Sequence, residues 1–175
     1  VIDYLTYGGL YREVWLEATA ESRLTDLFVY TPTLQEAVVQ WTAELTPAAA
    51  AVRIRLETTE GTLLAEQTAP AAETGKMQLS VPEAQPWDTE HPVLHHAVAE
   101  LLNAAGQPID RKQVTFGFRT AEFRADGFYL NGKKTFLRGL NRHQSYPYIG
   151  YAAPESLQRE DARILQEELH CTAVR

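Results

Sequence analysis

The stretch Val52-Arg53-Ile54-Arg55-Leu56-Glu57 alternates an apolar side chain with a charged one at every position. Successive side chains of a β-strand point to opposite faces of its sheet, so this period of two predicts a strand with one buried and one solvated face. Sheets with a single buried face are typically antiparallel. The alternation therefore favours an antiparallel β fold.

The same alternation recurs on both sides of this stretch, from Leu24 to about residue 120. Its apolar members are Leu27 and Val29; Val39, Trp41, Ala43 and Leu45; Met77, Leu79 and Val81; the run from Val93 to Leu102; and Val114, Phe116 and Phe118. Turn-forming residues separate these segments, among them Pro47, Glu60-Gly61 and Ala105-Gly106-Gln107-Pro108. Roughly seven short strands in about 100 residues predict an immunoglobulin-like antiparallel β-sandwich.

Two alanine-rich patches and the N-terminal residues complete this half of the chain. The patch from Ala48 to Ala51 could begin a helix, but Pro47 and the alternation that follows favour a turn into a strand. The patch near residue 70 indicates a loop or turn. Residues 1–20 predict one more strand, because apolar and polar side chains alternate from residue 13 to 19. The chain begins within an apolar pattern and without an initiator Met, so we expect a longer sequence upstream.

The pattern changes after residue 121. Asn131-Gly132, between Phe128-Tyr129-Leu130 and Thr135-Phe136-Leu137, predicts a tight β-hairpin. Between residues 150 and 170 the pattern is helical, with Pro154 in the first turn and an apolar stripe formed by Leu157, Ile164, Leu165 and Leu169. The acidic side chains of this segment are expected on its solvated face.

Strand-like runs stand on both sides of that helix. The run Phe136-Leu137-Arg138-Gly139-Leu140 delivers Asn141, Arg142 and His143 at its C-terminal end, and Cys171-Thr172-Ala173-Val174 ends on Arg175. Strand, helix and strand in this order predict one parallel β/α unit. Barrel enzymes place their chemistry at the C-terminal ends of such strands. The sequence therefore predicts the beginning of a site.

Composition excludes several classes of function. Hydrophobic residues make up 45% of the 175 residues and charged residues 22%, which is typical of a folded globular protein. The net charge of -7 argues against a nucleic-acid groove, and no apolar run is long enough to span a membrane. The lone Cys171 is expected to be a buried, inert thiol. His95 and His96 would point to opposite faces of a strand, so we expect two half-exposed histidines rather than a metal site.

Several local motifs together resemble the family 2 glycoside hydrolases, and within them the β-galactosidase branch. The motifs are Gly8-Gly9-Leu10-Tyr11-Arg12, Pro86-Trp87, Gly117-Phe118-Arg119, Leu130-Asn131-Gly132-Lys133, the run from Arg138 to Gln144, and Ala173-Val174-Arg175. Two positions depart from the family pattern, with Thr172 in place of Asn and Gln144 in place of Glu. The resemblance implies three parts: residues 1–20 as the last strand of a sugar-binding jelly roll, 21–121 as an immunoglobulin-like sandwich, and 122–175 as the truncated first β/α unit of a TIM barrel.

The resemblance also implies a chemistry. Retaining glycoside hydrolases use two carboxyl groups, and in this family both are glutamates from later barrel strands. His143 would bind sugar hydroxyls and Arg175 would support the ionised nucleophile, while Asn141 and Arg142 would belong to the site loop. No catalytic residue and no metal ligand is expected in the chain itself, which should be inactive alone. In the parent enzyme, a β-galactoside substrate and a homo-oligomer are expected, and the resemblance allows for magnesium and sodium ions, whose ligand positions are not recognisable in this sequence. A bacterial cytoplasm is slightly favoured as the compartment.

Three alternatives stay open at this stage. The sugar could be glucuronate or mannose instead of galactose, as in other enzymes of the family. Alternatively, residues 21–121 could be a non-catalytic sandwich that binds carbohydrate or a protein. The linker role is favoured because no cluster of surface aromatics is evident there. Tyr146, Tyr148 and Tyr151 could line a sugar-stacking wall or pack a loop. The exposed apolar stripe and strand edges of residues 135–175 favour association or domain swapping.

Overall fold

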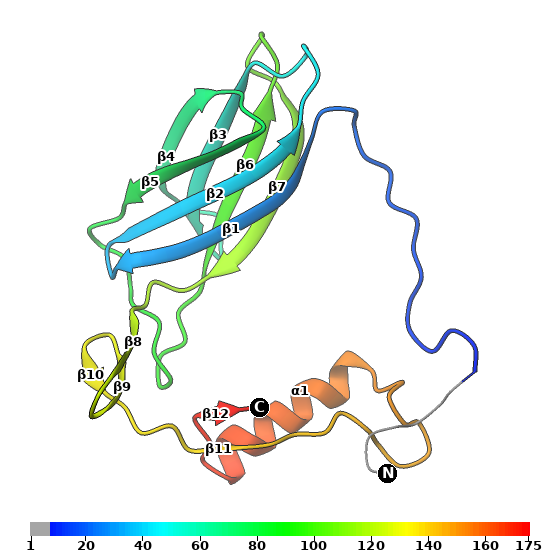
Figure 1. The fold of residues 1–175 in the computed structure, drawn as a ribbon, viewed down its shortest axis with the longest axis vertical. Helices are drawn as coiled ribbons and strands as arrows, with labels where there is room; N and C mark the ends of the chain where they lie inside the picture. Colours follow the sequence, from blue (N-terminus) through cyan, green and yellow to red (C-terminus); the bar gives the residue numbers. More distant parts are fainter. Residues whose placement is uncertain (1–7) are drawn as a thin grey trace. The chain divides into compact units, whose positions relative to one another are not determined.

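A computed structural model describes residues 8–175 and divides them into two compact units (Figure 1). One unit comprises Ala18–Thr135, and the other combines the described residues before Ala18 with Phe136–Arg175. No helix among the described residues is both long and apolar enough to cross a lipid bilayer. Each unit is built from its own strands.

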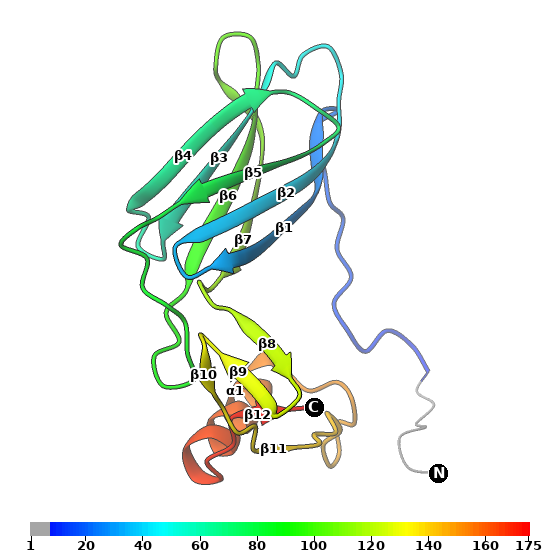
Figure 2. The same cartoon turned by 60° about the vertical axis from the view of Figure 1, so that its left-hand side comes forward.

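The larger unit is a sandwich of two antiparallel sheets, as Figures 1 and 2 show. Its strands are β1 (Arg23–Thr33), β2 (Glu36–Glu44), β3 (Ala51–Thr58), β4 (Leu63–Pro70), β5 (Thr74–Ser80), β6 (His95–Leu102) and β7 (Pro108–Phe116). Three strands form one sheet in the order β1-β2-β5, and four form the other in the order β4-β3-β6-β7. The predicted mainly-β, antiparallel class is confirmed, and Ala51 begins a strand rather than a helix.

The core lies between the two sheets and is built from the inward half of each alternating strand. In β3, Val52, Ile54 and Leu56 are fully buried, whereas Arg53 and Arg55 stay half-exposed. The largest fully buried side chain is Phe118, which follows β7. Burial of apolar area is the main favourable contribution to folding, and here it follows directly from the period of two.

On the opposite face of the four-stranded sheet, Glu100 holds two arginines. Its exposed fraction is only 6%, and Arg53, its direct partner across β3 and β6, donates from Nε and Nη2 to Glu100 Oε2 at 2.9 and 2.6 Å. Arg55 Nη2 donates to Glu100 Oε1 at 3.4 Å. Because a one-residue slip would separate these charges, the cluster favours the observed register of β3 and β6.

His95 differs from its prediction, because it is buried with an exposed fraction of 4% while only His96 is half-exposed. The His95 ring packs edge-on against Phe118 with the ring centroids 5.0 Å apart, and its Nδ1 is buried without a hydrogen-bond partner. This burial lowers the pKa of His95 from its ordinary value, although Glu60 opposes the change. The neutral imidazole is therefore the form that the fold accommodates.

The stability of the sandwich should consequently decrease in mild acid. Below about pH 6.5 the unfolded chain binds a proton at His95 that the folded chain does not, so the free energy of unfolding should fall by up to about 1.4 kcal/mol per pH unit from this residue. In His95→Phe this dependence of the free energy of unfolding on pH should disappear, whereas in the control His96→Phe it should remain. Urea denaturation at several pH values measures this slope. Equal slopes in wild type and His95→Phe would contradict the assignment.

A small meander follows the sandwich within the same unit. It consists of β8 (Ala121–Arg124), β9 (Gly127–Leu130) and β10 (Lys133–Lys134), with β9 in the middle. Asn131 and Gly132 both have positive φ, 52° and 76°, as a two-residue hairpin turn of the predicted type requires. Asn131 also donates from Nδ2 to the Trp87 carbonyl at 3.0 Å and accepts from the Thr120 amide at 3.0 Å. Its side chain thus ties the turn to the sandwich unit.

The smaller unit contains β11 (Gly139–Leu140), α1 (Glu155–Arg163), a π-helical turn (Ile164–Glu168) and β12 (Ala173–Val174). β11 and β12 pair in parallel, so the predicted strand-helix-strand order is present. Pro154 precedes α1 as its N-cap residue with extended geometry. The first strand is shorter than predicted, because it starts at Gly139 and leaves Phe136 82% exposed.

One further prediction of local structure is wrong, and another holds only in part. The alternation in residues 8–20 does not produce a strand: no other described strand pairs with this segment, and Leu16 and Trp15 stay exposed. A strand requires a hydrogen-bonding neighbour, which alternation alone does not supply. The alanine-rich patch near residue 70 is a loop only in part: Ala69 and Pro70 end β4, an edge strand that pairs with β3, whereas Ala71 and Ala72 lie in the connection to β5. Residues 1–7 lie outside the described part of the chain.

Candidate functional site

The predicted site residues follow two adjacent parallel strand ends. Leu140 in β11 is paired with Val174 in β12, and the Arg175 amide donates to the Leu140 carbonyl at 3.0 Å. The Arg142 amide in turn donates to the Arg175 carbonyl at 2.8 Å. His143 and Arg175 therefore lie just beyond the C-terminal ends of neighbouring strands, so their side chains start from the same edge of this two-stranded sheet.

Thr172 holds the start of β12 against the segment before β11. Its Oγ1 accepts a hydrogen bond from the Arg138 amide at 3.0 Å, and its own amide donates to the Arg138 carbonyl at 2.8 Å. Gly139 also permits the close pairing, because a Cβ at this position would come within 2.9 Å of the Ala173 carbonyl oxygen. The hydroxyl of Thr172 is thus part of the strand pairing that brings Arg175 beside the 141–143 loop.

A network of Arg142, Tyr146 and Asp161 fixes the loop that carries His143. Arg142 Nε donates to Asp161 Oδ2 at 2.7 Å, and Arg142 Nη2 donates to the Tyr146 hydroxyl at 2.9 Å. The Tyr146 hydroxyl donates to the same Asp161 oxygen at 2.5 Å. Hydrogen bonds from Tyr146 and Arg142 hold the pKa of Asp161 below its usual range, so the carboxylate stays ionised. Two donors on one carboxylate connect the loop to helix α1.

A hollow of about 270 Å³ lies against this network. It is lined by Leu140, Asn141, Arg142, His143, Asp161, Ile164 and Leu165. All three residues of the predicted site loop border this space, and Ile164 and Leu165 close its helical side. His143 and Asn141 are exposed, whereas Arg142 is partly buried by its ion pair. The loop thus exposes the His143 imidazole and the Asn141 amide to solvent, while the hydrogen-bonded network of Arg142, Tyr146 and Asp161 fixes the loop backbone beside them.

The other acidic residues of the helical segment are bound elsewhere. Glu155 pairs with Arg159, and Arg163 pairs with Glu160, Glu167 and Glu168, all on the exposed face. The expectation of a solvated acidic face is met for these four carboxylates but not for Asp161. Tyr146 packs the loop, whereas Tyr148 is fully exposed, so the tyrosines do not form one wall. Cys171 is free and half-buried rather than buried.

Metal binding finds no support in residues 8–175. Among them, no three His, Cys, Asp or Glu side chains come together in a group that could hold an ion. No chemical step is assigned to magnesium or sodium, which the resemblance suggests for the parent enzyme.

Sequence reasoning missed the roles of Tyr146 and Asp161. Asp161 lies four residues after Leu157 and three before Ile164, so it occupies the apolar stripe of the helix. A charged residue on an otherwise apolar helical face must find a partner, and the only cation that precedes this helix in the loop is Arg142. An aspartate within the apolar stripe of the helix was therefore the feature of the sequence that indicated an ion pair with Arg142.

Neutralising Asp161 should loosen the His143 loop. In Asp161→Asn the charge-assisted hydrogen bonds from Arg142 and Tyr146 are weakened, so the Arg142 amide should exchange with solvent about five- to tenfold faster. Glu155→Gln, which breaks a fully exposed pair on the same helix, is the matched control and should leave the exchange rate unchanged. Hydrogen exchange followed by NMR measures both. Identical rates in Asp161→Asn and wild type would show that the network does not hold the loop.

Comparison with known proteins identifies the family. Residues 22–119 match the description "Glycosyl hydrolases family 2", which covers more than half of the chain. A β-galactosidase of Thermoanaerobacter pseudethanolicus is 35% identical over 184 aligned positions, which take in 100% of this chain and 25% of that enzyme. The chain thus spans about a quarter of the relative that it matches.

Solved structures agree with this result. An apo structure of Bacteroides uniformis β-glucuronidase 3 superposes with a TM-score of 0.81 and 27% identity, over 97% of this chain and 22% of that one. Bifidobacterium dentium β-glucuronidase, solved with coumarin-3-O-glucuronide, superposes with a TM-score of 0.76 and 26% identity, over 89% of this chain and 27% of that one. On the family match and these shared folds, the chain belongs to the glycosyl hydrolases of family 2.

Proposed function

We propose that this chain is the part of a retaining glycoside hydrolase that supplies the immunoglobulin-like sandwich and the first β/α unit of a catalytic (β/α)8 barrel. The observation that carries the proposal is the parallel pairing of β11 with β12, which puts Asn141, Arg142, His143 and Arg175 at one sheet edge. Barrel enzymes build their sites at this edge. The division into residues 1–20, 21–121 and 122–175 is part of the same proposal.

In this mechanism the chain binds and orients the sugar, and the bond cleavage is carried out by carboxylates from other strands. Retaining hydrolysis requires two carboxyl groups about 5 Å apart, one to protonate the leaving oxygen and one to attack the anomeric carbon. The carboxylate of Asp161, which lines the same hollow as His143, is already engaged by Arg142 and Tyr146. His143 would hydrogen-bond a sugar hydroxyl through either ring nitrogen, and Arg175 would keep the nucleophile ionised.

The substrate that we propose is a terminal β-galactoside. The support comes from the β-galactosidase relatives, which are 35% and 36% identical over essentially the whole chain. A β-glucuronide is the second candidate, because the solved structures of similar fold include β-glucuronidases.

A segment exchange tests the proposal. Residues 1–175 alone should show no turnover of a nitrophenyl β-galactoside. A chimera, in which these residues replace the aligned quarter of the T. pseudethanolicus β-galactosidase, should hydrolyse it. Nitrophenyl β-glucuronide is assayed in parallel to separate the two sugars. Turnover by residues 1–175 alone would contradict the proposal, as would a chimera that unfolds cooperatively on heating yet cleaves neither substrate.

A further inference from the structure

The outer face of the β1-β2-β5 sheet carries two exposed aromatic rings. Phe28 and Tyr30 lie two residues apart in β1, so they share one face, and their exposed fractions are 55% and 42%. Their ring centroids are 6.2 Å apart and the ring planes are tilted by 33°. The expectation that this unit lacks clustered surface aromatics is therefore wrong. The two neighbouring rings form one contiguous exposed apolar surface on this sheet.

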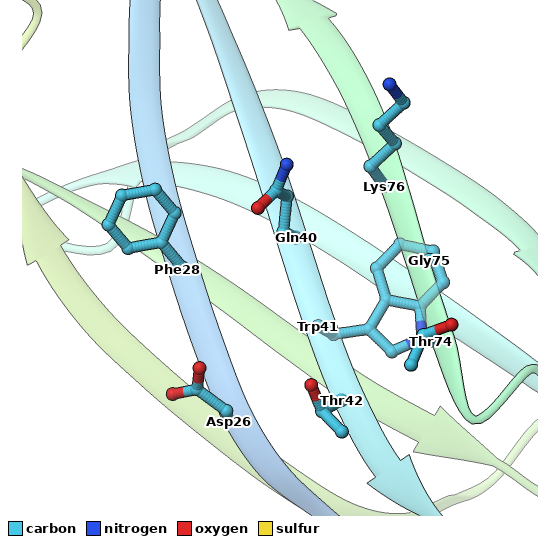
Figure 3. Close-up of a pocket in the computed structure, with 8 residues that line it drawn as sticks. All are labelled: Asp26, Phe28, Gln40, Trp41, Thr42, Thr74, Gly75 and Lys76. Atoms are coloured by element: carbon cyan, nitrogen blue, oxygen red, sulfur yellow. The ribbon is translucent and has the colours of Figure 1, made fainter.

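Polar side chains lie in register beside Phe28, the ring of the pair that borders a hollow. Phe28 is aligned with Gln40 of β2, which is aligned with Lys76 of β5. The next row along the strands consists of Asp26, Thr42 and Thr74. Figure 3 shows both rows, with the Phe28 ring, the Gln40 amide and the Lys76 amine beside one another on three neighbouring strands. Together with Trp41 and Gly75, these residues line a hollow of about 390 Å³.

The polar groups beside the hollow have no partners in the sandwich. Within residues 8–175, the side chains of Asp26, Gln40 and Lys76 make no hydrogen bond and no ion pair, although they lie on adjacent strands. Further along the same face the polar side chains are paired with each other, because Gln78 Nε2 donates to Glu36 Oε1 at 2.9 Å. Beside the exposed rings, a donor, an acceptor and an amide are thus available to a ligand.

We propose that this face binds a neutral oligosaccharide, with Phe28 and Tyr30 under the apolar face of the sugar rings and Asp26, Gln40 and Lys76 hydrogen-bonded to hydroxyl groups. Aromatic rings offer a large apolar surface, and hydroxyl groups both donate and accept, which fits an amide, a carboxylate and an ammonium group. One negative and one positive side chain leave the hollow without net charge, which favours a neutral sugar over a uronate.

A protein partner fits this surface less well. Specific protein interfaces bury about 800 Å² on each side around an apolar centre. Here the exposed apolar area is limited to two rings, and unpartnered polar groups lie directly beside them. This inference does not depend on the hydrolase proposal, because it concerns only the sandwich and would stand if the chimera proved inactive.

NMR titration of the full 175-residue chain with lactose, cellobiose and xylobiose tests the inference. At least one of these sugars should shift the backbone amide signals of β1, β2 and β5 in a saturable manner. Phe28→Ala should weaken that binding about tenfold, whereas Phe28→Trp should retain it. Phe123→Ala is the matched control, since Phe123 is 83% exposed in β8 outside this sheet.

Paired amide variants test the polar half of the site. Gln40→Ala should weaken binding severalfold, but Gln78→Ala should not, because the Gln78 amide is already bound to Glu36. The inference would be overturned by no shift with any of the three neutral sugars, by shifts located on other strands, by equal affinity in wild type and Phe28→Ala, or by a preference for digalacturonic acid over the neutral sugars. Shifts that depend on protein concentration without sugar would overturn it in favour of a second copy of the chain.

Discussion

Phe118→Ala is expected to lower the free energy of unfolding of the sandwich by about 3–5 kcal/mol. Phe118 is fully buried and packs edge-on against His95 and Phe116, with centroid distances of 5.0 and 5.1 Å. It also belongs to the Gly117-Phe118-Arg119 segment that leads out of β7, where the chain backbone is hydrogen-bonded to Trp87. Removing the ring would leave a cavity between these neighbours that the surrounding strands cannot fill.

Phe123→Ala provides the matched comparison for this prediction. The same atoms are removed, but Phe123 is 83% exposed, so the free energy of unfolding should change by less than about 1 kcal/mol. Urea denaturation followed by tryptophan fluorescence measures both variants. A loss in Phe118→Ala as small as that in Phe123→Ala would mean that the ring is not a central part of the core.

His143→Ala is expected to reduce kcat/KM of the chimera for nitrophenyl β-galactoside about 100-fold, with kcat carrying most of the loss. Hydrogen bonds to sugar hydroxyls strengthen as the ring distorts in the transition state, and losing one should cost about 2.7 kcal/mol of transition-state stabilisation. His143→Asn keeps a side chain that donates and accepts, so it should recover part of the activity. Because His143 is exposed, neither substitution should disturb folding.

His91→Ala serves as the control for this second prediction. His91 is an exposed histidine of the sandwich unit, with 75% of its side chain accessible, and its ring lies 3.5 Å from the Asp88 carboxylate on the surface. Its removal should leave both kcat and KM unchanged. Steady-state kinetics combined with thermal unfolding separates a loss of function from a loss of structure. Equal activity of His143→Ala and His91→Ala would remove His143 from the site.

Alternation predicted the parts of the fold in which one strand face is buried. β3 is the clearest case, since every apolar residue from Val52 to Leu56 is buried and every charged one is not. Alternation does not predict a strand in which few residues on either face are buried, and it does not guarantee a strand where no partner is available. β4 is an edge strand with few buried residues, so its sequence resembles a loop, whereas residues 8–20 alternate but have no neighbouring strand.

The candidate site was predictable only in its strand-borne part. The position of a polar residue directly after a strand is determined by that strand. Because β11 and β12 are parallel neighbours, His143 and Arg175 both lie at the C-terminal edge of their sheet, as expected. Asp161 reaches Arg142 across 19 residues, and such a contact depends on how helix α1 packs. The outward direction of Phe28 and Tyr30 was predictable, because these residues alternate in β1 with Leu27 and Val29, which were assigned to the core. The pairing of the two rings beside polar side chains depends on the neighbouring strands, which one strand's sequence does not show.

The most direct test of the account is a crystal structure of the chimera with a galactose-derived inhibitor bound. The account predicts that a ring nitrogen of His143 lies within about 2.7–3.2 Å of a sugar hydroxyl oxygen, with Arg175 beside the nucleophilic carboxylate. An inhibitor that occupies the barrel while His143 is turned toward the loop backbone and makes no contact with the sugar would contradict it.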